Sequence, residues 1–208
     1  MTDDEKWIYF QNLKHKKSWV DPVQPSTSSS RPNRFGRKTM LCDWWDQEGV
    51  IYYELLKPGE TVNAHRYYQQ LIKLHRALRE KRHYRKRHDK LIFLASSHTS
   101  TKVQNYLETL NWEMLPRFAY SPDLASSNYH LFSSMGHALA ERHFDSYEDV
   151  QKWLDEWFAS KDEEFFWRGI HKLPERWEKC TVSEVLWINL FLLPREKKCI
   201  FLTKKQRI

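Results

Sequence analysis

Three kinds of side chain in this 208-residue sequence could do chemistry: thiols, a run of basic groups and a few aspartates. The thiols are the simplest to interpret, because Cys42, Cys180 and Cys199 lie far apart, with no Cys-x-x-Cys motif and no paired histidine spacing. Such spacing favours reduced, buried thiols over a zinc site or a disulfide framework.

The basic groups gather in residues 64–90, which hold ten Lys or Arg against Glu80 and Asp89. This local balance of +8 exceeds the net charge of +7 for the whole chain, so the remainder is close to neutral. One basic stretch on a neutral body indicates a polyanionic partner. The alternative interpretation is a solvated helix face.

The aspartates of interest lie in two strand-like segments. Asp3 and Asp4 precede an aromatic and β-branched run at residues 5–10, and within one strand their side chains would point to opposite faces. Asp43 stands in the middle of the apolar run MLCDWW. If Asp43 faces the core, its carboxylate is costly when unpaired or becomes protonated.

Hydrophobic periodicity and capping signals predict the elements that must position these groups. Strands are expected at residues 5–10, 39–45, 50–56, 91–94 and 112–115, with a turn at 46–49, and helices at 63–81, from 99 or 100 to 110, 128–141, 146–158 and, as two short helices, 165–177. Residues 12–38 are rich in Pro and Ser without periodicity, which is typical of a functional or disordered loop. The order indicates a mixed α/β domain with a helical C-terminal part.

Composition sets the broad class of the chain. A hydrophobic fraction of 40% and an aromatic fraction of 15% allow a sizeable core. The longest apolar run, Val185 to Leu193, is about half a bilayer span, so no transmembrane helix is expected. The opening MTDDEKW lacks the features of a signal peptide. We therefore expect an intracellular globular protein.

Several segments together resemble the catalytic domain of a mariner-family (Tc1/mariner superfamily) transposase. They cover residues 2–180 and include TDDEKWIYF, WWDQEGVIYYELLKPGETVNA, TLNWEMLP, AYSPDLA and SNYHLFSSMGHALAE. The resemblance implies an RNase H-like fold, with a mixed five-stranded sheet flanked by helices. It also implies three acidic residues that hold two Mg²⁺ or Mn²⁺ ions for in-line attack on DNA phosphodiesters. Hard cations prefer anionic oxygens, and two such ions clamp the attacking and leaving oxygens.

Carried over by this resemblance, the catalytic and metal-binding candidates are Asp4, at the first family position, and Asn128, at the third. The second family aspartate belongs to a His-Asp-Asn sequence after the strand matching LIFL, and these three residues are missing here. Asn128 offers a neutral carbonyl oxygen, which is a weaker Mg²⁺ ligand than a carboxylate. Neither Asp3, on the other strand face, nor Asp123, in a turn, is expected to substitute.

The missing ligand predicts weak or lost binding of Mg²⁺ or Mn²⁺ and defective DNA cleavage and strand transfer. The leading hypothesis is a transposase-derived domain that associates with DNA. One alternative is an active divalent-metal-dependent transposase or endonuclease, and another is a relic reading frame without selected function. The expected partner is DNA, contacted at its phosphates without sequence preference. The candidate phosphate contacts are Arg66, Arg79, Arg82, Arg85, Lys86 and Arg87.

Further expectations concern the ends, the long loop and the location. Residues 12–38 correspond to the family's clamp loop, so a homodimer through this loop is one expectation and a solvated loop the other. The family's helix-turn-helix region does not precede Asp4, so sequence-specific recognition of transposon ends is not expected. Residues 181–208 leave the family pattern and are expected to be poorly ordered, with a membrane-associating tail as the alternative. We expect a nuclear or cytoplasmic, non-secreted protein with no small-molecule substrate.

Overall fold

The computed structural model describes residues 1–12, 36–82, 91–95, 101–116, 121 and 124–182. Most of the predicted clamp loop, the basic residues 83–90, Asp123 and residues 183–208 lie outside this description. In the described part, no helix is both long and apolar enough to cross a membrane.

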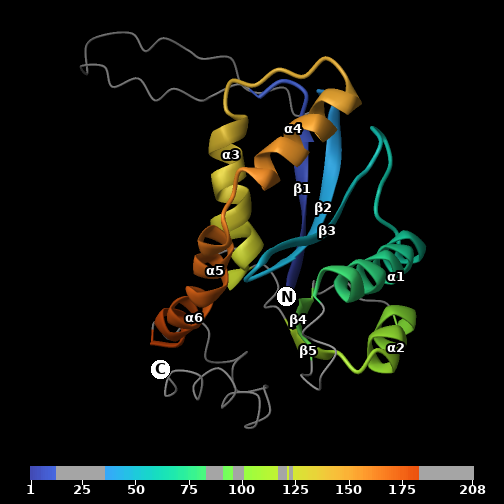
Figure 1. Ribbon diagram of the computed structural model, residues 1–208, viewed down its shortest axis with the longest axis vertical. Helices are drawn as coiled ribbons and strands as arrows, with labels where there is room; N and C mark the ends of the chain where they lie inside the picture. The colour runs from blue at the N-terminus through green and yellow to red at the C-terminus, as the bar shows by residue number, and fades with distance from the viewer. Residues whose placement is uncertain (13–35, 83–90, 96–100, 117–120, 122–123, 183–208) are drawn as a thin grey trace.

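A five-stranded mixed sheet forms the centre of the molecule (Figure 1). Its strands are β1 (Thr2–Tyr9), β2 (Lys38–Asp46), β3 (Gly49–Leu55), β4 (Ile92–Ala95) and β5 (Glu113–Pro116), in the order β3-β2-β1-β4-β5. Strands β1 to β3 are antiparallel, whereas β4 runs parallel to both β1 and β5. The predicted five-stranded mixed sheet is confirmed.

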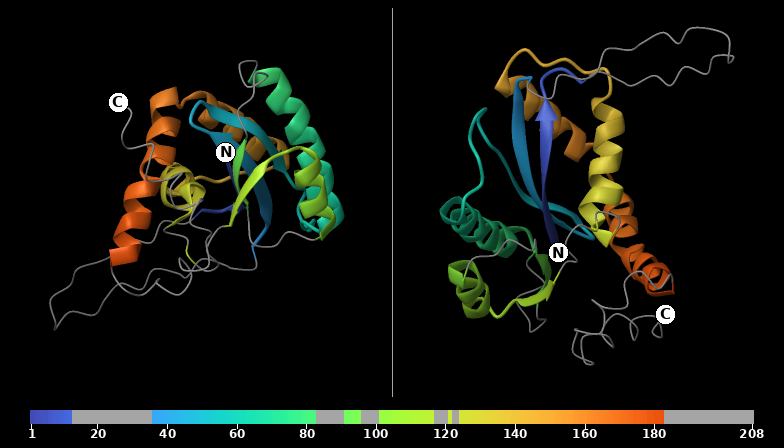
Figure 2. Two further views of the ribbon diagram at one scale, coloured as in Figure 1. Left: turned by 90° about the horizontal axis from the view of Figure 1, so that it is seen from below. Right: turned by 180° about the vertical axis from the view of Figure 1, so that it is seen from behind.

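Helices cover both faces of this sheet (Figures 1 and 2). One side carries α1 (Ala64–Lys81) and α2 (Thr101–Thr109). The other side carries η3 (Ser127–Phe132), α3 (Ser133–Leu139), α4 (Tyr147–Ala159), α5 (Glu163–His171) and α6 (Leu173–Val182). Local signals set several helix starts: Asn63 caps α1, and Ser146 forms a capping box with Asp149 before α4, as predicted.

Alternation along β2 divides its side chains between two cores. Leu41 and Trp45 pack towards α3, α4 and α5, whereas Cys42 and Trp44 pack towards α1 and α2. The thiol of Cys42 is free and buried, and burial raises its pKa far above the usual range. Asp43 lies two residues after Leu41, so its side chain projects from the same face of the sheet as that of Leu41.

The segment expected to be one helix over residues 128–141 is instead two elements. It begins as the π-helix η3 and continues as the α-helix α3. A π-turn holds one more residue than an α-turn, and such turns often occur at functional positions. Periodicity alone does not reveal this change, because the π-helical stretch is only six residues long.

Candidate active site

The structure brings together the two side chains that the family resemblance selected. Asp4, near the start of β1, is 7% exposed, and Asn128 is the second residue of η3. The Nδ2 of Asn128 donates a hydrogen bond of 2.6 Å to Oδ2 of Asp4. Asn128 thus presents a donor to the carboxylate, where a metal ligand would present an oxygen.

Contacts from β2 and α5 fix the position of η3. The indole Nε1 of Trp45 donates to Oγ of Ser127 at 2.9 Å, and the hydroxyl of Tyr129 donates to the carbonyl of Gly169. These bonds flank Asn128 on both sides in sequence. They therefore hold its amide beside β1.

Gly169 allows α5 to approach η3 closely. A Cβ at this position would lie 2.6 Å from Cδ2 of His130 and 2.8 Å from Cη2 of Trp45, both closer than real Cβ atoms come. Only glycine fits without movement of its neighbours.

Asp43 lies directly across the antiparallel ladder from Asp4. Cross-strand partners share one face of the sheet, with Cβ atoms about 4.5–5.5 Å apart. Asp43 is 0% exposed, and among the described residues neither of its carboxyl oxygens has a hydrogen-bond partner in another residue. Burial, and next the negative charge of Asp4, raise the pKa of Asp43 well above its usual range. The sequence indicated an awkward buried acid here but did not place it beside Asp4.

Asp3 points to the opposite face, as predicted from strand alternation. Its Oδ2 accepts a hydrogen bond of 2.7 Å from the hydroxyl of Tyr67 on α1. Asp3 is therefore separated from the Asp4–Asn128 pair by the sheet itself.

The strand next to β1 supplies no carboxylate to this site. Strand β4 consists of Ile92, Phe93, Leu94 and Ala95, and it meets β1 through the pairing of Leu94 with Thr2. In the sequence, no Asp or Glu occurs between Asp89 and Glu108. Within the residues that the structure describes, no three His, Cys, Asp or Glu side chains are grouped to hold a metal ion.

The side chains around Asp4 nevertheless have the chemistry of a hard-cation site. The carboxylates of Asp4 and Asp43 and the amide oxygen of Asn128 are ligand types that Mg²⁺ and Mn²⁺ accept. The buried, unpartnered oxygens of Asp43 fit this interpretation, because a bound cation would satisfy them. Two carboxylates suit one divalent ion better than the two ions of phosphodiester cleavage.

Arg82 does not have the surface position that its charge suggested. It is 8% exposed, and its Nη2 and Nε contact the two carboxyl oxygens of Asp46 at 2.9 and 3.2 Å. Its Nε also lies 3.3 Å from Oε2 of Glu48. Arg82 therefore forms an interior ion pair, in contrast to the phosphate contact expected from the sequence.

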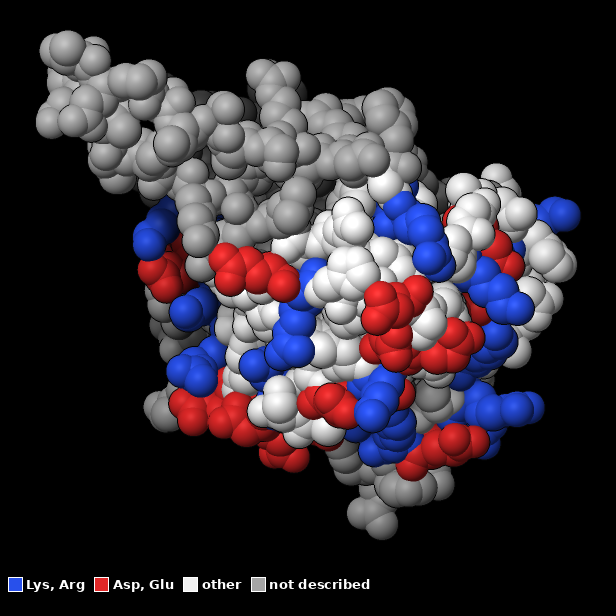
Figure 3. Space-filling model, turned by 90° about the horizontal axis from the view of Figure 1, so that it is seen from above, with Lys and Arg blue, Asp and Glu red and all other residues white. Residues whose placement is uncertain are grey.

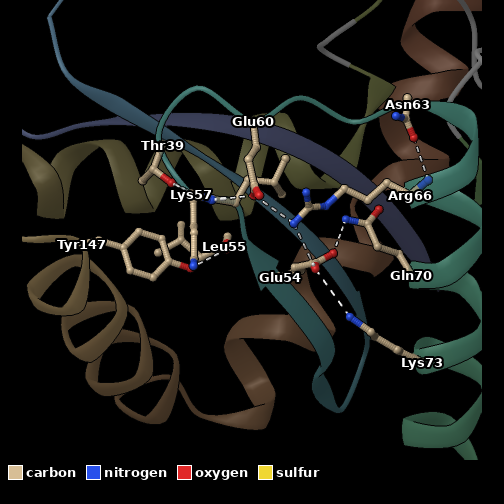
Figure 4. A network of polar contacts seen from close by, with 11 residues as sticks. Thr39, Glu54, Leu55, Lys57, Glu60, Asn63, Arg66, Gln70, Lys73 and Tyr147 are labelled. Carbon is tan, nitrogen blue, oxygen red and sulfur yellow. Dashed lines mark hydrogen bonds and ion pairs between the residues drawn. The ribbon is translucent and has the colours of Figure 1, made fainter.

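The other basic candidates differ in their availability. Figure 4 shows Arg66 between two carboxylates, with Nη2 at 3.0 Å from Glu60 and 3.5 Å from Glu54. Arg79 is exposed in the last turn of α1. The remaining candidates, Arg85, Lys86 and Arg87, lie outside the described residues.

The basic helix α1 and the Asp4–Asn128 pair lie on opposite faces of the sheet. Tyr67, Leu71 and Leu74 of α1 pack against the face that carries Asp3 and Trp44, not the face of Asp4. Figure 3 shows basic and acidic side chains interspersed over one face of the molecule, without a region of a single sign. The described part of the basic stretch, on α1, therefore lies across the sheet from the candidate site.

Comparisons with known proteins agree with this arrangement. A family model described as a transposase, partial DDE domain, matches residues 9–88. The mariner Mos1 transposase of Drosophila mauritiana is 70% identical over 188 residues, which cover 88% of this chain and 54% of the relative. The solved catalytic domain of Mos1 is 64% identical with a TM-score of 0.72, and the match covers 88% of this chain and 80% of that one.

The chain belongs to the mariner transposase family. Its sheet and flanking helices are the RNase H-like fold of a mariner catalytic domain, as the sequence predicted. The chain spans about half the length of Mos1 (54%). A pre-cleavage Mos1 transpososome is 72% identical, with a TM-score of 0.79 and coverage of 88% of this chain and 54% of that chain. Mos1 paired-end complexes have been solved with Mg and with Mn.

Proposed function

We propose that this mariner catalytic domain associates with DNA but is defective in metal-dependent DNA cleavage and strand transfer. The observation that carries the proposal is that Asp4 meets the neutral amide of Asn128, at the position where the family resemblance implies an acidic residue. An amide offers no negative charge to a metal, whichever of its atoms faces the site. Bound divalent ions would activate the attacking oxygen and stabilise the leaving one.

The chain's own residues support a defect at the second metal position as well. Strand β4 ends next to β1 without a carboxylate, and the first acid that follows it in sequence is Glu108. Loss of groups that only support metal ligands typically lowers affinity or activity about 10–100-fold. Loss of a ligand itself should lower cleavage at least as much.

Restoring the family pattern tests this proposal. The unmodified chain, a chain with His-Asp-Asn inserted after Leu94 together with Asn128→Asp, and the same restored chain with Asp4→Ala are incubated with supercoiled plasmid and Mg²⁺ or Mn²⁺. We expect background nicking from the unmodified chain, at least about 100-fold more from the restored chain, and a return to background with Asp4→Ala. Metal-dependent nicking by the unmodified chain that disappears with Asp4→Ala would refute the defect.

DNA association is proposed from the exposed end of α1 and from the transpososome relatives. Arg76 and Arg79 are exposed, and phosphate contacts from such side chains give affinity that is independent of sequence and falls with salt. In gel shifts, Arg76→Ala with Arg79→Ala should weaken binding and reduce the slope of log affinity against log salt by about 2. Arg66→Ala is the matched control, because Arg66 is already paired with Glu54 and Glu60.

We also propose pairing of two copies on DNA and a nuclear location. The Mos1 relatives were solved as paired-end complexes, which supports the first. Sedimentation with and without DNA tests it, since a complex of one chain per DNA would contradict pairing. Fluorescent tagging in cells tests the location.

A second candidate function, the relic reading frame, is favoured by one observation. Asp43 is fully buried, and its carboxyl group has no hydrogen-bond partner in another described residue, which is a cost that a selected fold normally avoids. A broad, non-cooperative thermal transition would support the relic, whereas a sharp two-state transition would argue against it.

A further inference from the structure

We propose that Asp43 supplies the second carboxylate of a one-cation site, formed with Asp4 and the side-chain oxygen of Asn128. This inference rests on the proposed function and deepens it, because it gives the non-cleaving site a ligand. The ligand would be one hard divalent cation, such as Mg²⁺ or Mn²⁺. The family resemblance assigns Asp43 no role.

The position of Asp43 beside Asp4 supports this assignment. Asp43 is the cross-strand partner of Asp4, so both carboxyl groups project from the same face of the sheet. Leu41 and Trp45, which share this face of β2, pack towards the helices that follow η3. Trp45 also donates to Ser127, the residue before Asn128. Three oxygen-bearing side chains from β1, β2 and η3 therefore converge on one region.

The surroundings of the Asp43 carboxyl group also favour a bound cation. It is wholly buried, and neither oxygen has a hydrogen-bond partner in another described residue. Among the described residues, the charges that raise the pKa of Asp43 are those of Asp4, Asp3 and Glu5, whereas Lys6 acts on Asp4. Like charges on opposed strands destabilise a sheet, and a buried charge requires a counter-charge. One divalent cation between Asp4 and Asp43 satisfies both requirements.

The side-chain amide of Asn128 can supply the third oxygen of the site. Its Nδ2 now donates to Asp4, and the oxygen and nitrogen of an amide are interchanged by a half-turn about the last side-chain bond. A cation bound to Asp4 neutralises its carboxylate, so the Nδ2 donor of Asn128 is no longer attracted to it. Asn128 can then offer its oxygen, as amides do in sites for hard cations.

Mn²⁺ binding tests the assignment without any DNA reaction. Mn²⁺ is titrated into the full 208-residue chain, and free Mn²⁺ is followed by electron paramagnetic resonance. We expect one Mn²⁺ per chain, at least about 10-fold weaker binding for Asp43→Asn, and a larger loss for Asp4→Asn.

Asp3→Asn is the matched control. It removes one negative charge from a buried aspartate of β1, but on the opposite face of the sheet, where Asp3 is bonded to Tyr67. Its Mn²⁺ affinity should stay within about 3-fold of the unmodified chain, a small change that reflects only long-range attraction. An equal loss for Asp3→Asn and Asp43→Asn would show a general charge effect and overturn the ligand role.

Asp43→Val is a second test of the ligand role, to be used if Asp43→Asn does not fold. Valine suits a buried strand position, so this variant should fold with a cooperative transition. Mn²⁺ should raise the melting temperature of the unmodified chain and leave that of Asp43→Val unchanged. Unchanged Mn²⁺ affinity in either Asp43 variant, or no binding by the unmodified chain at millimolar Mn²⁺, would overturn the inference.

The two proposals fail in different assays. Metal-dependent plasmid nicking by the unmodified chain would refute the cleavage defect, whatever the Asp43 variants do to Mn²⁺ affinity. Mn²⁺ binding that is independent of Asp43, with no nicking, would refute the ligand role and leave the defect in place.

Discussion

Two aspartates of β2, only three residues apart, have opposite surroundings. Asp46 is 1% exposed and receives two hydrogen bonds from Arg82, with a third from the backbone amide of Glu48 at 3.0 Å. Asp43 is 0% exposed, and no such bond reaches its oxygens from another described residue. The same side chain, on the same strand and equally buried, is satisfied in one place and not in the other.

The difference separates a structural acid from a candidate functional one. A buried charge is tolerated when a partner and hydrogen bonds compensate its lost hydration, as for Asp46. Where the fold provides no partner, the carboxyl group either holds a proton or binds a cation from solution. Four predictions test this distinction, in order of decreasing effect on stability.

Removing the partner of Asp46 should have the largest effect. Arg82→Met removes the counter-charge of the buried Asp46 and two of its hydrogen bonds, so the free energy of unfolding should fall by about 3–5 kcal/mol, measured by urea denaturation. Arg79→Met, on the exposed surface of α1, is the control and should change stability by less than about 0.5 kcal/mol. Similar small effects for both variants would remove the contrast between the two aspartates.

Removing the acid at position 43 should have the opposite sign. In EDTA, Asp43→Val should raise the free energy of unfolding by about 1–3 kcal/mol, because an unsatisfied buried polar group is replaced by an apolar one. Asp46→Val is the comparison, and it should destabilise the protein because the buried Arg82 loses its two hydrogen bonds to this carboxylate. A loss of stability in Asp43→Val would mean that Asp43 is already satisfied in the fold.

The pH dependence of stability should show that the buried carboxyl group of Asp43 lowers the free energy of unfolding. Burial raises the folded-state pKa of Asp43 well above the ordinary value of 3.8, so the folded chain keeps this proton to higher pH than the unfolded chain. Its contribution is therefore fully present below about pH 4 and is lost as pH rises towards the folded pKa. Relative to Asp43→Asn, the unmodified chain should lose up to about 1.4 kcal/mol per pH unit in this window. Urea denaturation in EDTA from pH 4.5 to 7.5 measures it, and parallel curves would contradict the assignment.

The outer contact of Arg82 should matter least. Glu48 has 30% of its side chain exposed, and its Oε2 lies 3.3 Å from Nε of Arg82. Glu48→Gln should therefore lower the free energy of unfolding by less than about 1 kcal/mol, again measured in urea. An effect as large as that of Arg82→Met would show that Asp46 alone does not hold the arginine.

Sequence reasoning located the elements where the signals are local. The cap at Asn63, the capping box at Ser146 and the turn before Gly49, whose φ is +130°, each depend on residues a few positions apart. These features need no knowledge of distant partners. The element order and the mixed sheet followed from them.

The tertiary partners could not be found in the same way. Asp43 faces Asp4 because of the β1–β2 register, and Arg82 meets Asp46 across 36 residues of chain. Charge alone placed Arg82 on the surface, since arginine is seldom buried. Asp4 and Asn128 were selected by family resemblance, and nothing local to either residue indicates that they meet.

The missing side chain at Gly169 ties the C-terminal helices to the amide of Asn128. Any larger residue at position 169 would clash with His130 and Trp45. Because Trp45 is hydrogen-bonded to Ser127, this clash would also displace η3. The close approach of α5 at Gly169 therefore helps to set the distance between Asn128 and β1. Substitutions at Gly169 should therefore change the cation affinity of the proposed site, although α5 supplies none of its proposed ligands.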